Sequence, residues 1–314
     1  MKEIKIQISK TQNLKIKNLS FQSLLSSKPL IACWGFFDGI HQGHQTLFNK
    51  LITIAKTNNY ETCIISFNEK PQSVTDEIAN QVLLSKEDKI KRINDFGINY
   101  YLEIEFTKEL SRTSPQQFIA WLISCGVKSV IINRNVRFGY QGQGTIKTLQ
   151  QSSLQVYLCD DVFVGNHDKV SSTLVKQLLQ NKDIINANLC LAPNEYYITG
   201  KVVHGIKEGR TIGFPTANLE LNTNYALPGV ATYITVTQVD DKWYQSMTVI
   251  MMRNNVPLVE TYLLNFNQNL YDKVITVKFL TWLRDNLRFS SLDDLKVQLR
   301  QDLEDTVDYF KNHS

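Results

Sequence analysis

The stretch Gly35-Phe36-Phe37-Asp38-Gly39-Ile40-His41-Gln42-Gly43-His44 decides how the first part of this chain folds. It follows an apolar run from Pro29 to Trp34, which is typical of a buried strand. Beyond it, apolar residues recur about every four positions from Leu47 to Ala55, which predicts a helix. The stretch is therefore a Gly-rich turn between a strand and a helix, where backbone N–H groups and the positive helix end can surround an anion.

Two histidines, His41 and His44, add side-chain donors to this turn. Imidazole titrates near neutral pH and can offer an N–H to a phosphate. The absence of Lys and the spacing of the glycines exclude a Walker P-loop. The pattern H-x-G-H is typical of nucleotidyltransferases, in which both histidines stabilise a nucleoside triphosphate while its α-phosphate is attacked. The alternative is an ordinary tight turn with two exposed histidines.

Length and composition suit a two-domain globular protein. The chain has 314 residues, of which 43% are hydrophobic and 20% charged, and its net charge is +4. This mild charge suits a phosphate-bearing ligand and gives no argument for nucleic acid. The five cysteines form no C-x-x-C and lie in apolar runs, so we expect buried thiols in a reducing compartment. The apolar runs are too short to span a membrane, and residues 1–17 lack a signal-peptide core, so a cytoplasmic location is expected.

Strand and helix patterns alternate through the first half of the chain. Strands are predicted at 2–9, 30–34, 61–67, 100–106, 128–133 and 155–159, and helices at 45–57, 85–96, 114–125, 174–181 and 183–191. This alternation predicts a mostly parallel sheet with helices on both faces, which binds ligands beyond the carboxyl ends of its strands. We expect the His turn, Asn68–Pro71 and Asn133–Gly144 to line one crevice there.

The pattern changes after about residue 185. Strands are predicted at 196–203, 230–239, 243–252, 260–266 and 274–281, without helices between them. They predict a small antiparallel β-barrel, followed by an amphipathic helix from Ser291 to Lys311. The sequence therefore predicts an α/β domain at 1–185 and a barrel domain at 186–314.

A second motif, Gly205-Ile206-Lys207-Glu208-Gly209-Arg210-Thr211-Ile212-Gly213-Phe214-Pro215-Thr216-Ala217-Asn218, lies in the barrel. Its glycines and basic residues can wrap donors around phosphates, and Thr216 and Asn218 offer neutral oxygens for a magnesium ion. Glu260, in an otherwise apolar strand, can act as a general base for a hydroxyl nucleophile. The alternatives are a hairpin turn with a basic rim and an outward-facing strand carboxylate.

With both motifs in place, the chain resembles bacterial bifunctional riboflavin kinase/FAD synthetases from about Leu30 to Tyr309. The resemblance depends on Phe37–His44, Arg137–Gly139, Ser171–Thr173, Val202–Asn218 and Val259–Phe266. It implies a Rossmann-like nucleotidyltransferase domain that adenylylates FMN to FAD, and a riboflavin kinase-like barrel that phosphorylates riboflavin to FMN. ATP is the expected co-substrate and Mg²⁺ the expected metal. The expected partners are small-molecule flavins, and neither nucleic acid nor a membrane is expected. The expected assembly is a monomer or a weak homo-oligomer.

The resemblance also implies roles for individual residues. His41, His44 and Glu260 are the expected catalytic residues, and Thr216 and Asn218 the expected metal ligands. The expected ATP-binding residues are Gly35, Phe37, Asp38, Gly43, Arg137, Ser171, Ser172, Thr173, Gly205, Lys207, Gly209, Arg210, Thr211 and Gly213.

The sequence departs from the family pattern mainly in the first domain and in flavin contacts. Phe36 replaces an Asn, Ser66–Pro71 loses a His, Asn135 replaces an Asp, and Leu174 and Lys176 stand where the family has Arg. The flavin-side loop is shortened to Met252–Pro257. The alternative hypothesis is therefore a diverged paralogue that retains one activity, or one that binds flavin or nucleotide and regulates without catalysis.

Overall fold

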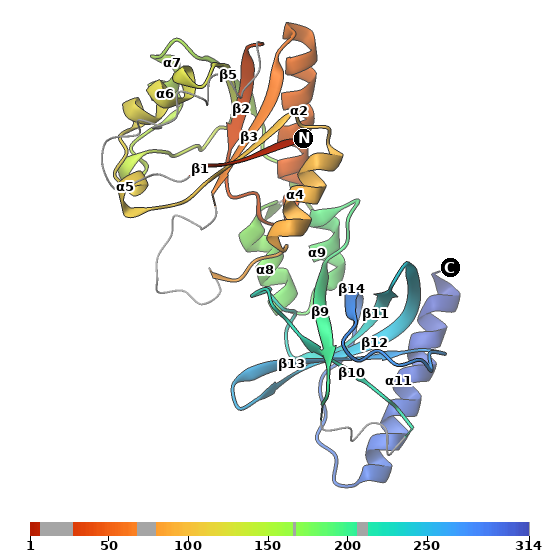
Figure 1. Cartoon of the computed structure of the whole chain (residues 1–314). Coiled ribbons are helices and arrows are strands. Elements are labelled where there is room, and N and C mark those ends of the chain that lie inside the picture. The colour runs from red at the N-terminus through yellow and green to blue at the C-terminus, as the bar shows by residue number, and fades with distance from the viewer. Residues whose placement is uncertain (7–27, 68–79, 166–167, 206–212, 314) are drawn as a thin grey trace. The chain divides into compact units, whose positions relative to one another are not determined.

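The computed structural model describes residues 1–6, 28–67, 80–165, 168–205 and 213–313. The chain forms two compact units (Figure 1). The first comprises Met1–Asn80 and Lys86–Phe163, and the second comprises Gln81–Ser85 and Val164–Ser314.

The first unit is built on a six-stranded parallel sheet with strand order β1-β4-β3-β2-β5-β6. The strands are β1 (Lys2–Ile6), β2 (Leu30–Trp34), β3 (Glu61–Phe67), β4 (Tyr100–Ile104), β5 (Val127–Asn133) and β6 (Gln155–Cys159). The helices are η1 (Asp38–Ile40), α2 (Gln42–Asn58), α4 (Lys86–Asp95), α5 (Lys108–Ser111), α6 (Pro115–Ser124), η2 (Tyr140–Gly142) and α7 (Ile146–Gln150). Figure 1 shows α2 and α4 on one side of the sheet and α5, α6 and α7 on the other, which confirms the predicted α/β fold.

The central strands are apolar on both faces because helices cover both faces. Leu30 and Ala32 of β2 pack in one core cluster with Phe118 and Leu122 of α6. On the opposite face, α2 packs against β2, β3 and β5. Helix α6 begins as its sequence predicts, because the Ser114 side chain and Gln117 form a capping box.

The strand order reverses at β2, which lies between β3 and β5. Such a reversal is where open α/β sheets bind ligands, beyond the carboxyl ends of the strands. The His turn leaves the carboxyl end of β2 and the loop at 134–144 leaves that of β5. These two predicted lining segments therefore start at the same edge of the sheet. The third, Asn68–Pro71, lies outside the described residues.

The second unit is a closed antiparallel barrel with strand order β10-β13-β12-β11-β14-β9. Its strands are β9 (Tyr197–Val203), β10 (Ala217–Glu220), β11 (Ala231–Val239), β12 (Lys242–Arg253), β13 (Val256–Leu263) and β14 (Val274–Arg284), and its helices are α8 (Ser172–Gln180), α9 (Ile184–Leu191) and α11 (Leu292–Asn312). Two short strands, β7 (Phe163–Val164) and β8 (Asp168–Lys169), pair with each other. The barrel and its closing helix confirm the predicted fold.

Buried hydroxyl groups tie the barrel strands together from inside. Thr235 contacts Ser246 at 2.7 Å and Thr248 at 2.8 Å, and Thr248 donates to Thr261 at 2.9 Å, all at 0% exposure. Each buried hydroxyl thereby has a partner, as buried polar groups require. Because successive strand residues face opposite ways, Glu260, next to Thr261, points to the outside of the barrel.

Helices α8 and α9 group with the barrel, although the predicted domain boundary at 185 falls inside α9. The contacts explain this grouping. The Asn188 amide donates to the Phe279 carbonyl at 2.9 Å and accepts from the Tyr196 N–H at 2.8 Å. Which fragment folds by itself stays a prediction.

The shortened loop at Met252–Pro257 is a tight hairpin. Strand β12 continues to Arg253 and β13 begins at Val256, so only Asn254 and Asn255 form the turn. Their φ angles are 50° and 61°, in the left-handed region that Asn tolerates better than most residues.

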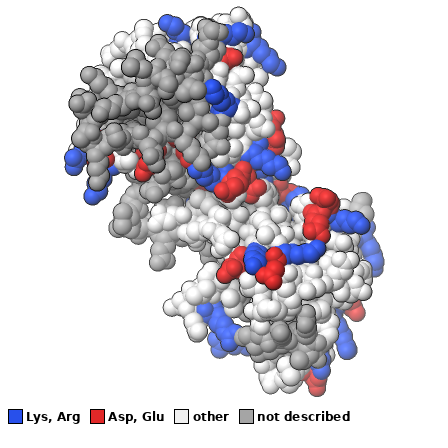
Figure 2. Space-filling view, in the orientation of Figure 1, with Lys and Arg blue, Asp and Glu red and all other residues white. Residues whose placement is uncertain are grey.

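The surface carries charges of both signs. On the face shown in Figure 2, Lys and Arg side chains lie interspersed with Asp and Glu over the described residues. This mixed pattern agrees with the small net charge of +4.

Candidate active sites

The turn after β2 reverses the chain through residues with positive φ. The Gly35 N–H donates to the Ile65 carbonyl at 3.1 Å and continues the sheet by one residue. Phe37, Gly39 and Ile40 then have φ angles of 55°, 80° and 45°. Two of these are non-Gly residues, for which this conformation is uncommon and often marks a functional site. The turn delivers His41 to the N-cap of α2.

His41 and His44 lie together at the start of α2. Their rings stack with centroids 3.7 Å apart, and the His44 backbone N–H donates to the His41 carbonyl at 2.8 Å. The edge-to-face ring of Phe37, itself 4% exposed, lies 5.2 Å from His44. The structure thus brings the two predicted histidines to the positive end of a 17-residue helix, as anion binding requires.

The His44 imidazole has an unusual electrostatic environment. Burial lowers its pKa well below the ordinary value, and His41 and Lys89 lower it further. Its Nδ1 atom is buried and has no hydrogen-bond partner among the described residues. His44 is therefore neutral at neutral pH and can donate through a single N–H.

The other predicted nucleotide-binding residues of the first unit lie in two segments, the His turn and the loop after β5. Asp38 is 3% exposed in η1, and Gly43 lies in the first turn of α2. Arg137 is exposed in the loop after β5. Gly139 in that loop has a φ of 70°, and a Cβ there would lie 2.7 Å from the Pro115 nitrogen, so this position needs Gly.

The remaining predicted ATP-binding residues belong to the second unit or lie outside the described residues. Ser171, Ser172 and Thr173 belong to the second unit, where the Ser171 hydroxyl caps α8 by accepting from the Leu174 N–H at 3.1 Å. Their role in binding ATP stays a prediction. The predictions for Lys207, Gly209, Arg210 and Thr211 fall outside the described residues, and Gly213 is exposed beside them.

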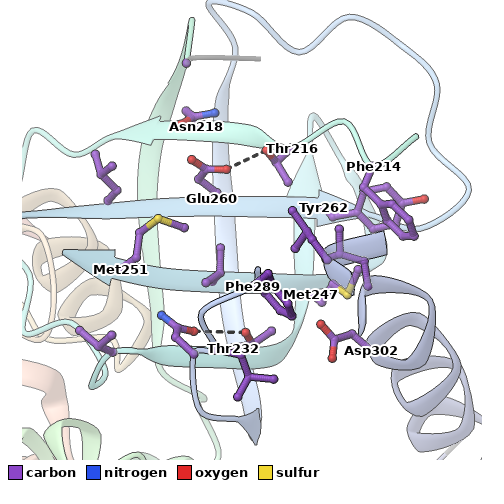
Figure 3. A pocket seen from close by; sticks show the side chains of 18 of the residues that line it. Phe214, Thr216, Asn218, Thr232, Met247, Met251, Glu260, Tyr262, Phe289 and Asp302 are labelled. Carbon is purple, nitrogen blue, oxygen red and sulfur yellow. Dashed lines mark hydrogen bonds between the residues drawn. The ribbon is translucent and has the colours of Figure 1, made fainter. Parts of the chain in front are cut away.

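The second unit contains a cavity of about 690 Å³ on the outside of the barrel (Figure 3). Gly205, Thr216, Asn218 and Glu260 all line it, so the structure brings the predicted metal ligands and the predicted base together. Glu260 points outward from the barrel, as the alternative expects, and this cavity lies on the side that it faces; its role as a base stays a prediction. The volume of the cavity falls in the range of small-molecule binding sites.

The polar end of the cavity is tightly organised. The Thr216 hydroxyl donates to the Glu260 carboxylate at 2.9 Å, and Asn218 stands opposite Glu260 in the register of β10 and β13. Gly205 lies against Asn218, since a Cβ on Gly205 would come within 2.4–2.6 Å of the amide atoms. A larger residue at position 205 would therefore displace the Asn218 amide.

Two comparisons with known proteins assign the family. Residues 25–174 match the family model for FAD synthetase, and residues 192–310 match that for riboflavin kinase. The chain is 30% identical over 290 residues to the bifunctional riboflavin kinase/FMN adenylyltransferase of Bacillus subtilis, which covers 88% of this chain and 92% of that protein. It is 32% identical over the same length to the corresponding protein of Buchnera aphidicola subsp. Schizaphis graminum.

The chain belongs to the bifunctional riboflavin kinase/FMN adenylyltransferase family. The fold agrees along nearly the whole length with a crystal structure titled macrolide-efflux protein from Streptococcus pneumoniae. That structure has a TM-score of 0.84 and 25% identity, and the match covers 96% of this chain and 98% of that one. Within the described residues, no helix combines the length and apolar character needed to cross a bilayer.

The apolar wall of the cavity in the second unit was not predicted from the sequence. It is formed by Met247, Tyr262, Phe289, Leu295 and Leu299 among others, and Figure 3 shows the labelled ones around one hollow. The leucine spacing predicts α11 but not the surface that the helix covers.

An ion pair anchors α11 beside the cavity. The Arg284 guanidinium donates to both carboxylate oxygens of Asp302, at 2.6 and 2.5 Å, and Gln298 donates at 2.9 Å. Asp302 is 1% exposed, so the pair is largely withdrawn from water. No sequence pattern signals it, because the two partners belong to different elements.

Proposed function

We propose that this chain catalyses two successive steps of FAD biosynthesis. The barrel unit phosphorylates riboflavin to FMN, and the α/β unit adenylylates FMN to FAD. The observation that carries the proposal is the cavity in which Thr216, Asn218 and Glu260 meet an apolar wall, because a flavin needs an apolar site and its hydroxyl needs a base. The family membership supports both activities.

In the kinase step, Glu260 is the proposed general base. The terminal ribityl hydroxyl of riboflavin is a poor nucleophile at neutral pH and must lose its proton as its oxygen attacks the γ-phosphorus of ATP. The bond between that phosphorus and the β–γ bridging oxygen breaks, and ADP leaves. The hydrogen bond from Thr216 supports this role, because it fixes the carboxylate orientation before substrate arrives.

Magnesium fits the polar end of the cavity. Thr216 and Asn218 supply neutral oxygens there, and the ion would take its remaining ligands from nucleotide phosphates and water. The closeness of Gly205 to the Asn218 amide supports the fit. Because Gly205 has no Cβ, the Asn218 amide can occupy a position that any other residue at 205 would obstruct. When bound, the ion would neutralise charge on the γ-phosphate.

In the adenylyl-transfer step, His41 and His44 are the proposed phosphate-binding donors. An FMN phosphate oxygen attacks the α-phosphorus of ATP, the bond to the bridging oxygen breaks, and pyrophosphate leaves. The imidazole N–H groups and the N-terminus of α2 stabilise the charge on the triphosphate. The stacked rings at the helix start support these roles.

Compartment and assembly are also proposals. The five free cysteines, all buried, support the cytoplasm as the location. A monomer or weak homo-oligomer stays the prediction.

The test is product chromatography with the full chain. Riboflavin, ATP and Mg²⁺ should give FMN and then FAD, and FMN with ATP and Mg²⁺ should give FAD and pyrophosphate. Omission of Mg²⁺ should abolish FMN formation. A chain that binds flavin or ATP but forms neither product would refute the proposal and favour the regulatory paralogue.

A further inference from the structure

A lysine of α4 is buried directly behind the His turn. Lys89 is 7% exposed, although Lys side chains are rarely buried unless they are paired. Its ammonium group donates to the Phe36 carbonyl at 3.2 Å and to the Ser66 hydroxyl at 3.4 Å, and lies 4.6 Å from the centroid of the Phe36 ring. Lys89 therefore joins α4 to the turn after β2 and to the end of β3.

The charged groups around Lys89 show why it can be buried. Burial lowers its pKa, while the carboxylates of Asp38 and Glu103 raise it and the ammonium group of Lys86 lowers it. Asp38 and Glu103 are 3% and 7% exposed. Lys86 forms an ion pair with Glu103 at the outer side of this cluster, with 42% of its own side chain exposed. Two buried carboxylates thus balance the Lys89 ammonium group.

The Phe36 carbonyl, which accepts from Lys89, lies immediately before the strained part of the turn. Three of the next four residues, Phe37, Gly39 and Ile40, hold positive φ angles, which most side chains avoid. A backbone of this kind persists only where surrounding contacts fix it. The Ser66 hydroxyl also donates to this carbonyl, at 3.4 Å, so β3 and α4 both hold the entrance of the turn.

We propose that Lys89 is a positioning residue for adenylyl transfer: it fixes the turn that carries His41 and His44 through the Phe36 carbonyl, and it supplies a buried positive charge to the His44 side of that turn. The proposal rests on the proposed function of this turn. A fixed cation there serves a reaction in which negative charge gathers on a triphosphate, because preorganised charge needs no rearrangement when the substrate binds.

The charge contributes to the protonation of His44 with a definite sign. The groups that act on the His44 imidazole are His41 and Lys89, and those that act on Lys89 are Asp38, Glu103 and Lys86. A like charge disfavours protonation, so Lys89 lowers the pKa of His44. Removal of the Lys89 charge should therefore raise the pH at which His44 takes up its proton.

The experiment compares full-length wild type with Lys89→Met and Lys89→Arg. Histidine ring signals are followed by NMR from pH 8 down to the lowest pH at which the chain stays folded, because the pKa of His44 is well below its ordinary value; the experiment is tractable because the chain has five histidines. His44→Ala identifies the His44 signal. In Lys89→Met the His44 midpoint should rise by about one pH unit, and in Lys89→Arg it should stay near the wild-type value. FAD formation from FMN should fall about 10- to 100-fold in kcat for Lys89→Met, because the turn is no longer held.

A matched control lies three residues earlier on the same helix. Lys86→Met removes an equal charge from α4, and the contact that the structure gives the Lys86 side chain is its partly exposed ion pair with Glu103. It should leave the His44 midpoint and FAD formation near wild type. Riboflavin kinase activity, measured in the same samples, reports whether each variant is folded. Should Lys89→Met fail to fold, Lys89→Gln removes the charge while keeping a donor for the Phe36 carbonyl.

An unchanged His44 midpoint in the uncharged variant would overturn the proposal, as would equal losses of FAD formation in the Lys86 and Lys89 variants. Wild type that forms no FAD would refute the proposed function itself. Normal wild-type FAD formation with an unchanged midpoint would refute only the role of Lys89.

Discussion

Gly205→Ala should damage the kinase site through a single steric contact. The φ of Gly205 lies outside the positive region, so Ala fits the backbone, but its Cβ would lie 2.5 Å from Asn218 Cγ. Carbon atoms in contact normally stay about 3.5–4.0 Å apart, so the Asn218 amide must move by about 1 Å. A misplacement of that size at a reacting centre costs about 100-fold in rate, or about 2.7 kcal/mol.

The assay is steady-state FMN formation from riboflavin, with FMN adenylylation as the internal reference. Gly205→Ala should lower kcat/KM of the kinase about 100-fold and leave adenylyl transfer intact. In an Asn218→Ala background the amide atoms are gone, so the same change at Gly205 should cost little more. Full kinase activity in Gly205→Ala, or the same fall in both backgrounds, would refute the reasoning.

Three further outcomes are expected. Thr216→Val removes the hydroxyl that donates to the Glu260 carboxylate and should lower kinase kcat about tenfold. Thr216→Ser keeps a hydroxyl and should keep the wild-type kcat. Equal rates for the two variants would show that this hydrogen bond does not contribute to the kinase step. Asp302→Asn breaks a buried ion pair and should lower the free energy of unfolding in urea by about 3 kcal/mol, and an unchanged midpoint would contradict this. A fragment of residues 164–314 keeps α8 and all of α9, so it should melt at a higher temperature than residues 186–314; the reverse order would favour the predicted boundary near 185.

Local patterns were enough to predict most elements of the fold. The buried run Leu30–Trp34 and the spacing beyond it predicted β2 and α2 correctly, because both signals depend on neighbours in the sequence. The start of α2 was less accurate: it begins at Gln42, not after His44. The reason is the positive φ of Phe37 and Ile40, which is imposed by packing and is not favoured by either residue type.

The sequence predicted which residues belong to the candidate sites, but not the contacts between their side chains. Motif chemistry selected Thr216 and Glu260, whereas their hydrogen bond joins positions 44 residues apart and depends on the register of β10 and β13. The burial of Lys89 behind Phe36 has the same origin, since it joins α4 to a turn 53 residues away. The turn at Asn254 and Asn255 could have been predicted, because Asn favours the positive φ of two-residue hairpins.

The most direct test of two separate active sites is a reciprocal comparison of His44→Ala and Glu260→Gln. His44→Ala should form FMN from riboflavin at the wild-type rate and lose about 100-fold or more in FAD formation, as expected for a lost preorganised donor. Glu260→Gln should form FAD from added FMN normally and lose about 100- to 10,000-fold in riboflavin phosphorylation. If either variant loses both activities in parallel while remaining folded, the assignment of one reaction to each unit is wrong.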